Sequence, residues 1–240
     1  GFVVHNEEQP NLIPWKVNNL YNFFSTGLVP QDPASVAKYG EAFEYFKYAD
    51  EYPIFPCYTA NQVDKKQYSG GTNNFSNINF TVQARAYEAA LRTYDPEHKY
   101  VTPEMLATMV EWCAWNVFPD GGDVRYPNNN EFFNADNRDW RSGNYYRSWI
   151  YHNILGNYNY VFVEDMAGLR PRSDNIIELW PIDFGYDYFM VNNLRYHGKD
   201  ITIVWDKIDG DQKYSPNIPE GYSLYIDQKL VLRLDKLVRV

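Results

Sequence analysis

The spacing of hydrophobic residues predicts helices through the larger part of the chain. In residues 101–118, VTPEMLATMVEWCAWNVF, apolar side chains recur every three or four positions, which is the period of one helix face. Thr102 is a suitable N-cap, and Pro103 suits the first helical position because its missing N–H costs no hydrogen bond there. The buried stripe of this helix is expected to contain Leu106, Met109, Val110 and Cys113.

A second strong helical pattern covers residues 77–94, NINFTVQARAYEAALRTY. Weaker helical patterns cover residues 15–24, 35–48 and 145–166, and each is followed by Pro, Gly or Asn. The first part of the chain is therefore predicted to consist of helical hairpins joined by long polar loops. The buried face of the 77–94 helix is expected to contain Phe80, Ala84, Tyr87, Leu91 and Tyr94.

The period changes to that of β-strands from about Leu169 onward. Short segments that often alternate apolar and polar residues are separated there by Gly, Asp, Asn and Pro: IIELWP, YFMVNNLRYHG, ITIVWD, YSLYID and LVLRLD. His197 and Gly198 are expected to form a hairpin turn and not a functional site. We therefore predict a mainly α protein with two units, a helical one over residues 1–169 and an antiparallel β-sandwich over residues 170–240.

Composition and charge exclude several classes of protein. Hydrophobic residues make up 45% of the chain, but no apolar run approaches the ~20 residues of a transmembrane helix. The net charge is -9 and the basic residues are scattered, which argues against a nucleic-acid partner. The two cysteines are too few for a disulfide framework, and their spacing fits no metal site. The sequence contains no phosphate-binding loop, dinucleotide fingerprint or nucleophilic-serine motif, and no cofactor is expected.

The aromatic content suggests a class of ligand. Aromatic residues make up 18% of the chain, and many of the 22 tyrosines adjoin Asn, Asp or Gly. Most of these rings are expected to pack in the core. Aromatic rings beside amides and carboxylates also suit a carbohydrate. The rings can stack on the apolar faces of sugar rings, while the amides and carboxylates hydrogen bond to the sugar hydroxyl groups.

The segment RYPNNNEFFN, residues 125–134, holds one carboxylate, Glu131, among amides and aromatic rings. It follows the helix predicted from Thr102, and loops on a rigid scaffold commonly carry function. Hydrogen bonds from neighbouring amides would keep this carboxylate ionised. By itself, the pattern is equally typical of a solvated loop glutamate. Other acids nearby have the sequence contexts of turn formers; they are Asp120, Asp123, Asp136 and Asp139.

Two further segments carry polar groups that suit a carbohydrate. Residues 70–79, GGTNNFSNIN, combine amides with glycines that allow close backbone approach, although the segment equally suits a helix-capping loop. In residues 145–156, YYRSWIYHNILG, Ser148 and His152 lie one helical turn apart. A structural or substrate-contacting role is favoured for His152 over a catalytic one, because nothing in the sequence orients its ring.

Seven motifs follow one another along nearly the whole chain: PNLIPWKVNNLYNFFSTGLVP, YPIFPCYTANQ, GGTNNFSNINFTV, YPNNNEFFN, YRSWIYHNILG, MAGLRPRSDNIIELWPID and VNNLRYHGKDITIVWD. Together they resemble the C-terminal part of six-hairpin glycoside hydrolases, in the group of mannosylglycerate-hydrolase-like and processing-α-glucosidase-like enzymes. The resemblance implies part of an (α/α)6 toroid of helical hairpins followed by a small β-domain. It also implies hydrolysis of a glycoside or polysaccharide, without specifying the sugar.

The resemblance further implies where the catalytic groups lie. In this group a Gly-rich loop lines the sugar site and the next hairpin presents a glutamate as general base; residues 70–79 and Glu131 occupy these places in order. Asn replaces the Trp-Gly-Pro pattern of the first loop, and Phe132 and Phe133 replace Asn-Tyr after the glutamate. The general acid of the group is an aspartate on an earlier hairpin, to which no segment here corresponds. An N-terminal half of the same enzyme, covalently attached or separate, is therefore the expected protein partner.

The reaction implied is an inverting hydrolysis in which Glu131 takes a proton from the attacking water. Two other functions stay open: a non-catalytic carbohydrate-binding or structural protein, and, more remotely, a polysaccharide lyase. The residues expected to contact the carbohydrate are Trp15, Lys16, Asn18, Tyr58, Asn61, Gln62, Asn73, Asn74, Tyr145, Arg147 and His152.

Overall fold

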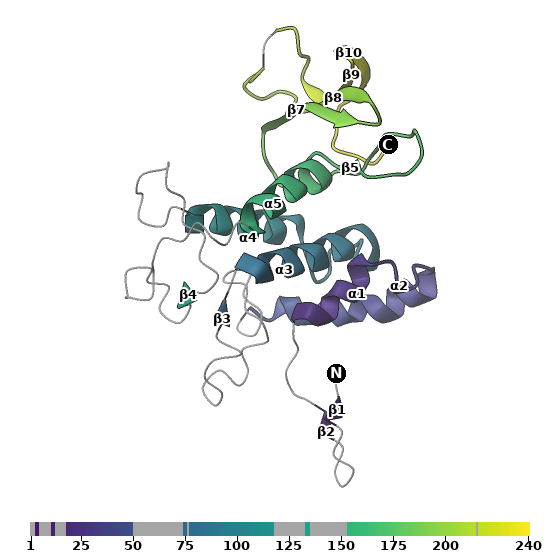
Figure 1. Cartoon of the computed structure of the whole chain (residues 1–240), viewed down its shortest axis with the longest axis vertical. Helices are drawn as coiled ribbons and strands as arrows, with labels where there is room; N and C mark the ends of the chain where they lie inside the picture. Colours follow the sequence, from purple (N-terminus) through teal and green to yellow (C-terminus); the bar gives the residue numbers. More distant parts are fainter. Residues whose placement is uncertain are drawn as a thin grey trace. The chain divides into compact units, whose positions relative to one another are not determined.

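The chain forms a helical unit followed by a β-unit. The computed structural model describes residues 3–4, 11–12, 18–49, 74–75, 77–117, 133–134, 153–214 and 216–240. Residue contacts divide the chain into two compact units, Gly1–Gly156 and Asn157–Val240. The predicted order of helices first and antiparallel strands afterwards is confirmed (Figure 1). Among the described residues, no helix combines the length and the apolar character needed to cross a membrane.

The helices of the first unit follow the predicted patterns. Thr102 lies immediately before α4, as expected for its N-cap, and the Asp32 carboxylate caps α2 by accepting hydrogen bonds from the Ala34 and Ser35 N–H groups. A pair of two-residue strands, β1 (Val3–Val4) and β2 (Asn11–Leu12), precedes the helices. The helical elements are η1 (Asn18–Tyr21), α1 (Asn22–Ser25), α2 (Pro33–Gly40), η2 (Glu41–Lys47), α3 (Asn77–Ala89), the π-helical η3 (Ala90–Tyr94) and α4 (Pro103–Val117).

The helix α3 occupies the centre of the first unit. It contacts η1, α1 and α4, and its π-helical continuation η3 contacts α2 (Figure 1). All five residues of its predicted stripe are buried. Phe46 of η2 meets the Tyr87 ring edge-on at a centroid distance of 5.0 Å, and Tyr21 lies 4.8 Å from Phe46. Within the described ranges these helices form an open group and not a closed ring.

The second unit is built around an antiparallel meander. Its helical part is α5 (Asn153–Tyr160), which crosses the division between the units, and the π-helical η4 (Val161–Met166). A short ribbon of β5 (Leu169–Arg170) and β6 (Glu178–Leu179) follows. The strands β7 (Tyr188–Tyr196), β8 (Lys199–Asp206), β9 (Gly221–Ile226) and β10 (Lys229–Leu234) then pair in sequence order to form one four-stranded sheet.

Two tight turns set the register of this sheet. His197 and Gly198 have φ angles of 49° and 77°, which is the left-handed conformation of a two-residue type I′ hairpin. The turn predicted at this position is therefore confirmed. Asp227 and Gln228, with φ angles of 48° and 67°, connect β9 to β10 in the same way. The β8–β9 connection is longer and is tied to the sheet by the buried Asp206 carboxylate, which accepts the Lys213 N–H at 3.1 Å.

One face of the sheet buries the core of the second unit. Ile201 and Ile203 of β8 have no exposed surface, and Tyr222 of β9 is equally buried. The Tyr222 hydroxyl donates a hydrogen bond to the Ala167 carbonyl at 2.6 Å, and the Trp205 indole N–H donates to the Tyr186 carbonyl at 2.9 Å. This core therefore lies between the sheet and the segment that connects η4 to β7.

Candidate functional site

A short antiparallel pair joins the two loops in which the sequence places the site. The strand β3 (Asn74–Phe75) pairs with β4 (Phe133–Asn134), with Asn74 opposite Asn134 and Phe75 opposite Phe133. The two strands come from segments nearly 60 residues apart, GGTNNFSNIN and RYPNNNEFFN. Asn74 and Phe75 of the first segment and Phe133 and Asn134 of the second therefore meet in the fold.

The pair is positioned by the central helix of the first unit. β3 ends two residues before α3 begins at Asn77, and α3 is fixed by the fully buried rings of Phe80 and Tyr87. The strand β3 therefore lies near the N-terminus of a well-anchored helix. A helix N-terminus favours negative charge, because its first N–H groups have no partner within the helix.

Three buried polar side chains lie further along this helix and were missed by sequence reasoning. The Arg92 guanidinium donates to the Glu88 carboxylate at 2.6 Å, and the exposed fractions of the two side chains are 5% and 8%. Gln83 donates a hydrogen bond of 2.8 Å to the Tyr87 hydroxyl. A Glu and an Arg four residues apart are also typical of an exposed helix face, so the sequence carries no signal that this pair is buried.

A fourth buried polar group organises the connection between η3 and α4. The Asp95 carboxylate accepts hydrogen bonds from the N–H groups of Lys99, Tyr100 and Val101, at distances of 2.9, 2.7 and 2.9 Å. The carboxylate closes this turn by satisfying three backbone N–H groups, which explains how a charged side chain is accommodated at a position that is 3% exposed. We assign Asp95 a structural role.

The described residues include two of the predicted carbohydrate contacts. Asn74 belongs to β3, and Asn18 is the first residue of η1, an element that contacts α3. The predicted general base, Glu131, lies outside the described residues, two positions before β4. The other predicted contacts also lie outside them: Trp15, Lys16, Tyr58, Asn61, Gln62, Asn73, Tyr145, Arg147 and His152.

Within the part of the chain that the structure describes, no group of three or more His, Cys, Asp and Glu side chains is arranged to hold a metal ion. The ionisable groups just described are instead paired with guanidinium or backbone N–H groups.

Comparison with known proteins finds a structural similarity. No protein-family model matches the sequence. The fold is similar to part of a solved chain described as a sialidase, with a TM-score of 0.72 and 19% sequence identity. The match covers 94% of this chain and 20% of the other, so this chain spans about one fifth of the length of that protein. At this identity the similarity concerns the fold.

Proposed function

We propose that this chain is part of a glycoside hydrolase and that Glu131 is the carboxylate that activates water. The observation that carries the proposal is the antiparallel pairing of β3 with β4. Glu131 and Phe133 are two positions apart in sequence, so covalent geometry keeps their Cα atoms within about 7 Å of each other. The pairing thereby supports a position for Glu131 beside the Gly- and Asn-rich loop, where a polyhydroxylated ligand would find amide partners.

The proposed chemistry requires Glu131 to be ionised. A general base must take a proton from water, and amide donors together with the positive end of α3 favour the charged carboxylate. In an inverting hydrolase the general acid stands about 6.5–9.5 Å from the base, which leaves room for the water between them. We propose that this acid is supplied from outside the chain, by a preceding half of the same enzyme.

The proposed scaffold is an (α/α)6 toroid of which these helices are one part. The open group of helices around α3 and the match to one fifth of a longer chain both support a larger assembly. We further propose that the C-terminal sheet is one layer of a small β-sandwich appended to the toroid. The predicted contacts, from Trp15 to His152, would then line a carbohydrate site at one mouth of the ring.

The match to a sialidase supports glycoside hydrolysis as a class and leaves the sugar open. Sialidases hydrolyse glycosides, but they generally use a tyrosine nucleophile and not a water-activating glutamate. A fold similarity over one fifth of that protein does not transfer its substrate. A sialoside therefore belongs in the substrate panel beside neutral glycosides.

The decisive experiment replaces Glu131 with Gln in the complete enzyme, in which the proposed preceding half that supplies the acid is present. Turnover of a panel of 4-nitrophenyl α- and β-glycosides and a 4-nitrophenyl sialoside is measured, with circular dichroism as a check on folding. We expect the Glu131→Gln variant to lose about 10²- to 10⁴-fold in rate with an unchanged spectrum. The product anomer, followed by proton NMR, should show inversion.

Two variants serve as controls. Glu97→Gln changes an exposed glutamate that pairs with Lys99, and it should leave the rate unchanged. Asp136→Asn tests the acidic residue nearest to Glu131 in sequence. Normal turnover by Glu131→Gln would reject the assignment of the base. Carbohydrate binding by the unmodified complete enzyme, including the preceding half, without turnover of any glycoside would favour the non-catalytic alternative.

A further inference from the structure

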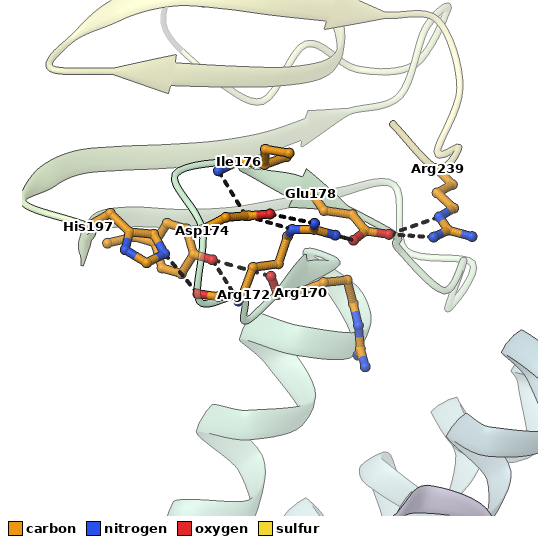
Figure 2. Close-up of polar contacts among 8 residues, drawn as sticks. Arg170, Arg172, Asp174, Ile176, Glu178, His197 and Arg239 are labelled. Carbon is orange, nitrogen blue, oxygen red and sulfur yellow. Dashed lines mark hydrogen bonds and ion pairs between the residues drawn. The ribbon is translucent and has the colours of Figure 1, made fainter. Parts of the chain in front are cut away.

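Three separate segments of the β-unit meet at the carboxylate of Glu178. The Arg172 guanidinium donates to its Oε2 atom at 2.8 Å, and Arg239 donates to its Oε1 atom through Nε at 3.0 Å and Nη2 at 2.6 Å (Figure 2). Glu178 and Arg239 lie 61 residues apart in sequence. The Glu178 side chain is 15% exposed, so one largely buried carboxylate is shared by two guanidinium groups.

Val240, the residue after Arg239, pairs with the outer edge of β6. The Leu179 N–H donates to the Val240 carbonyl at 2.9 Å, and the Val240 N–H donates to the Leu179 carbonyl at 2.8 Å. Because β5 pairs with the opposite edge of β6, Val240 completes a third row of this small sheet. The Arg239 guanidinium also stacks over the Trp180 ring at 3.9 Å from its centroid. We refer to residues 235–240 as the strap.

Arg172, the partner of Glu178 on the side away from the strap, is fixed to the four-stranded sheet. Arg172 makes a two-pronged contact with Asp174, at 2.9 and 2.7 Å, and its backbone N–H donates to the Tyr196 hydroxyl at 3.0 Å. Its carbonyl lies 3.0 Å from Nε2 of His197, at the tip of the β7–β8 hairpin (Figure 2). Glu178 is thus anchored on one side by Arg172 and holds the strap on the other.

We propose that the strap opens and closes independently of the four-stranded sheet and that Glu178 is its latch. The contact between Glu178 and Arg239 is the more exposed of its two ion pairs, because the Arg239 side chain is 57% exposed and the Arg172 side chain 36%. The sheet, in contrast, is held by the long β7–β8 and β8–β9 pairings and by the buried core around Ile201 and Ile203. Local opening begins where few buried contacts must break. Opening frees the N–H and carbonyl of Leu179, and with them the edge of β6.

The proposal is tested by hydrogen exchange on the intact protein, and it does not depend on catalysis. The Glu178→Gln variant keeps the size of the side chain but loses the charge that binds both guanidinium groups. We expect the Leu179 and Val240 amides to exchange about tenfold faster, while the Ile201 and Ile203 amides are unchanged. The Arg239→Met variant, which removes only the strap side of the latch, should give the same result.

The matched control is Asp187→Asn, which removes an exposed ion pair with Lys207 in the same unit. It should leave the exchange of Leu179 and Val240 unchanged. Equal acceleration of the strap and β8 amides in Glu178→Gln and Arg239→Met would show that the strap opens only with the whole unit. Unchanged exchange in both variants would show that Glu178 is not the latch. Either result overturns the proposal.

Discussion

Gly40 of α2 packs directly against the backbone carbonyl of Tyr94 in η3, so closely that a side-chain carbon on Gly40 would overlap the carbonyl oxygen. The Gly40 φ angle of -59° is ordinary for a helix, so the reason for glycine is space and not backbone conformation. The Tyr94 hydroxyl donates a hydrogen bond of 2.7 Å to the Val29 carbonyl, which ties η3 to the segment before α2. Gly40 therefore sets how closely α2 approaches the central helix.

Replacing Gly40 with Ala should lower the stability of the helical unit by about 1–3 kcal/mol, because the overlapping backbone has to move. Gly156→Ala is the matched control, since nothing lies within 4 Å of the added carbon and the site is an exposed helical position. That variant should gain about 0.5–1 kcal/mol from helix propensity. Urea denaturation followed by circular dichroism measures both, and equal effects of the two substitutions would contradict the packing argument.

The Tyr222→Phe substitution should destabilise the β-unit by about 1–2 kcal/mol. It removes the hydroxyl that donates to the Ala167 carbonyl and leaves that carbonyl without its partner in a buried site. Ser223→Ala, on the next residue, is the comparison. The Ser223 hydroxyl is buried and makes no hydrogen bond within the described residues, so its removal should leave stability unchanged or slightly raised. Unfolding monitored by tryptophan fluorescence distinguishes the two, and a larger loss at Ser223 would contradict this account.

The Arg172 guanidinium holds the pKa of Asp174 down to about 2, mainly through its hydrogen bonds to the carboxylate. The pKa of Glu178 is lowered by Arg172 and then by Arg239. A carboxylate with a depressed folded-state pKa stabilises the fold above its unfolded pKa of about 4. That contribution is lost as the pH falls through the folded-state pKa. We therefore expect the β-unit to lose stability between about pH 4 and pH 2.

An NMR titration of the Asp174 carboxyl carbon tests the cause of this shift. In the Arg172→Met variant the pKa of Asp174 should rise toward its ordinary value, because both hydrogen bonds from the guanidinium are gone. In the Arg195→Met variant, which removes a different exposed ion pair, the pKa of Asp174 should stay low. A low pKa of Asp174 in both variants would assign the shift to the Ile176 N–H and the surrounding backbone instead.

The hydrophobic pattern was sufficient to predict the elements but not their long-range contacts. The stripe from Phe80 to Tyr94 is buried as expected, because helix periodicity is a local property of the sequence. The turn at His197 and Gly198 was also predictable from local residue types. The pairing of Glu178 with Arg239 depends on how the chain returns after β10, and no local pattern specifies it.

The candidate site shows the same contrast: local residue types could be read from the sequence, but contacts between distant segments could not. Sequence reasoning selected the loops that contain Asn74 and Glu131 from their residue types and order. It did not predict that Asn74 would lie opposite Asn134, because two-residue strands are too short to have a recognisable alternation. The burial of Glu88 was missed for a related reason: a charged residue is buried only when a neighbouring element supplies the cover, and its own segment does not encode that element.

The turn between β9 and β10 offers a stabilising substitution. Gln228 has a φ angle of 67°, a left-handed conformation that is costly for a residue with a Cβ, and Asp-Gly is a favoured pair for this turn type. Gln228→Gly should therefore raise the stability of the β-unit by about 0.5–1 kcal/mol, even though glycine adds entropy to the unfolded chain. Gly198→Ala, at the equivalent position of the β7–β8 turn, should lower it by about 1–2 kcal/mol. If backbone conformation decides the outcome, thermal unfolding will show a higher midpoint temperature for Gln228→Gly and a lower one for Gly198→Ala. A loss of stability in Gln228→Gly would show that contacts of the Gln228 side chain outweigh the strain.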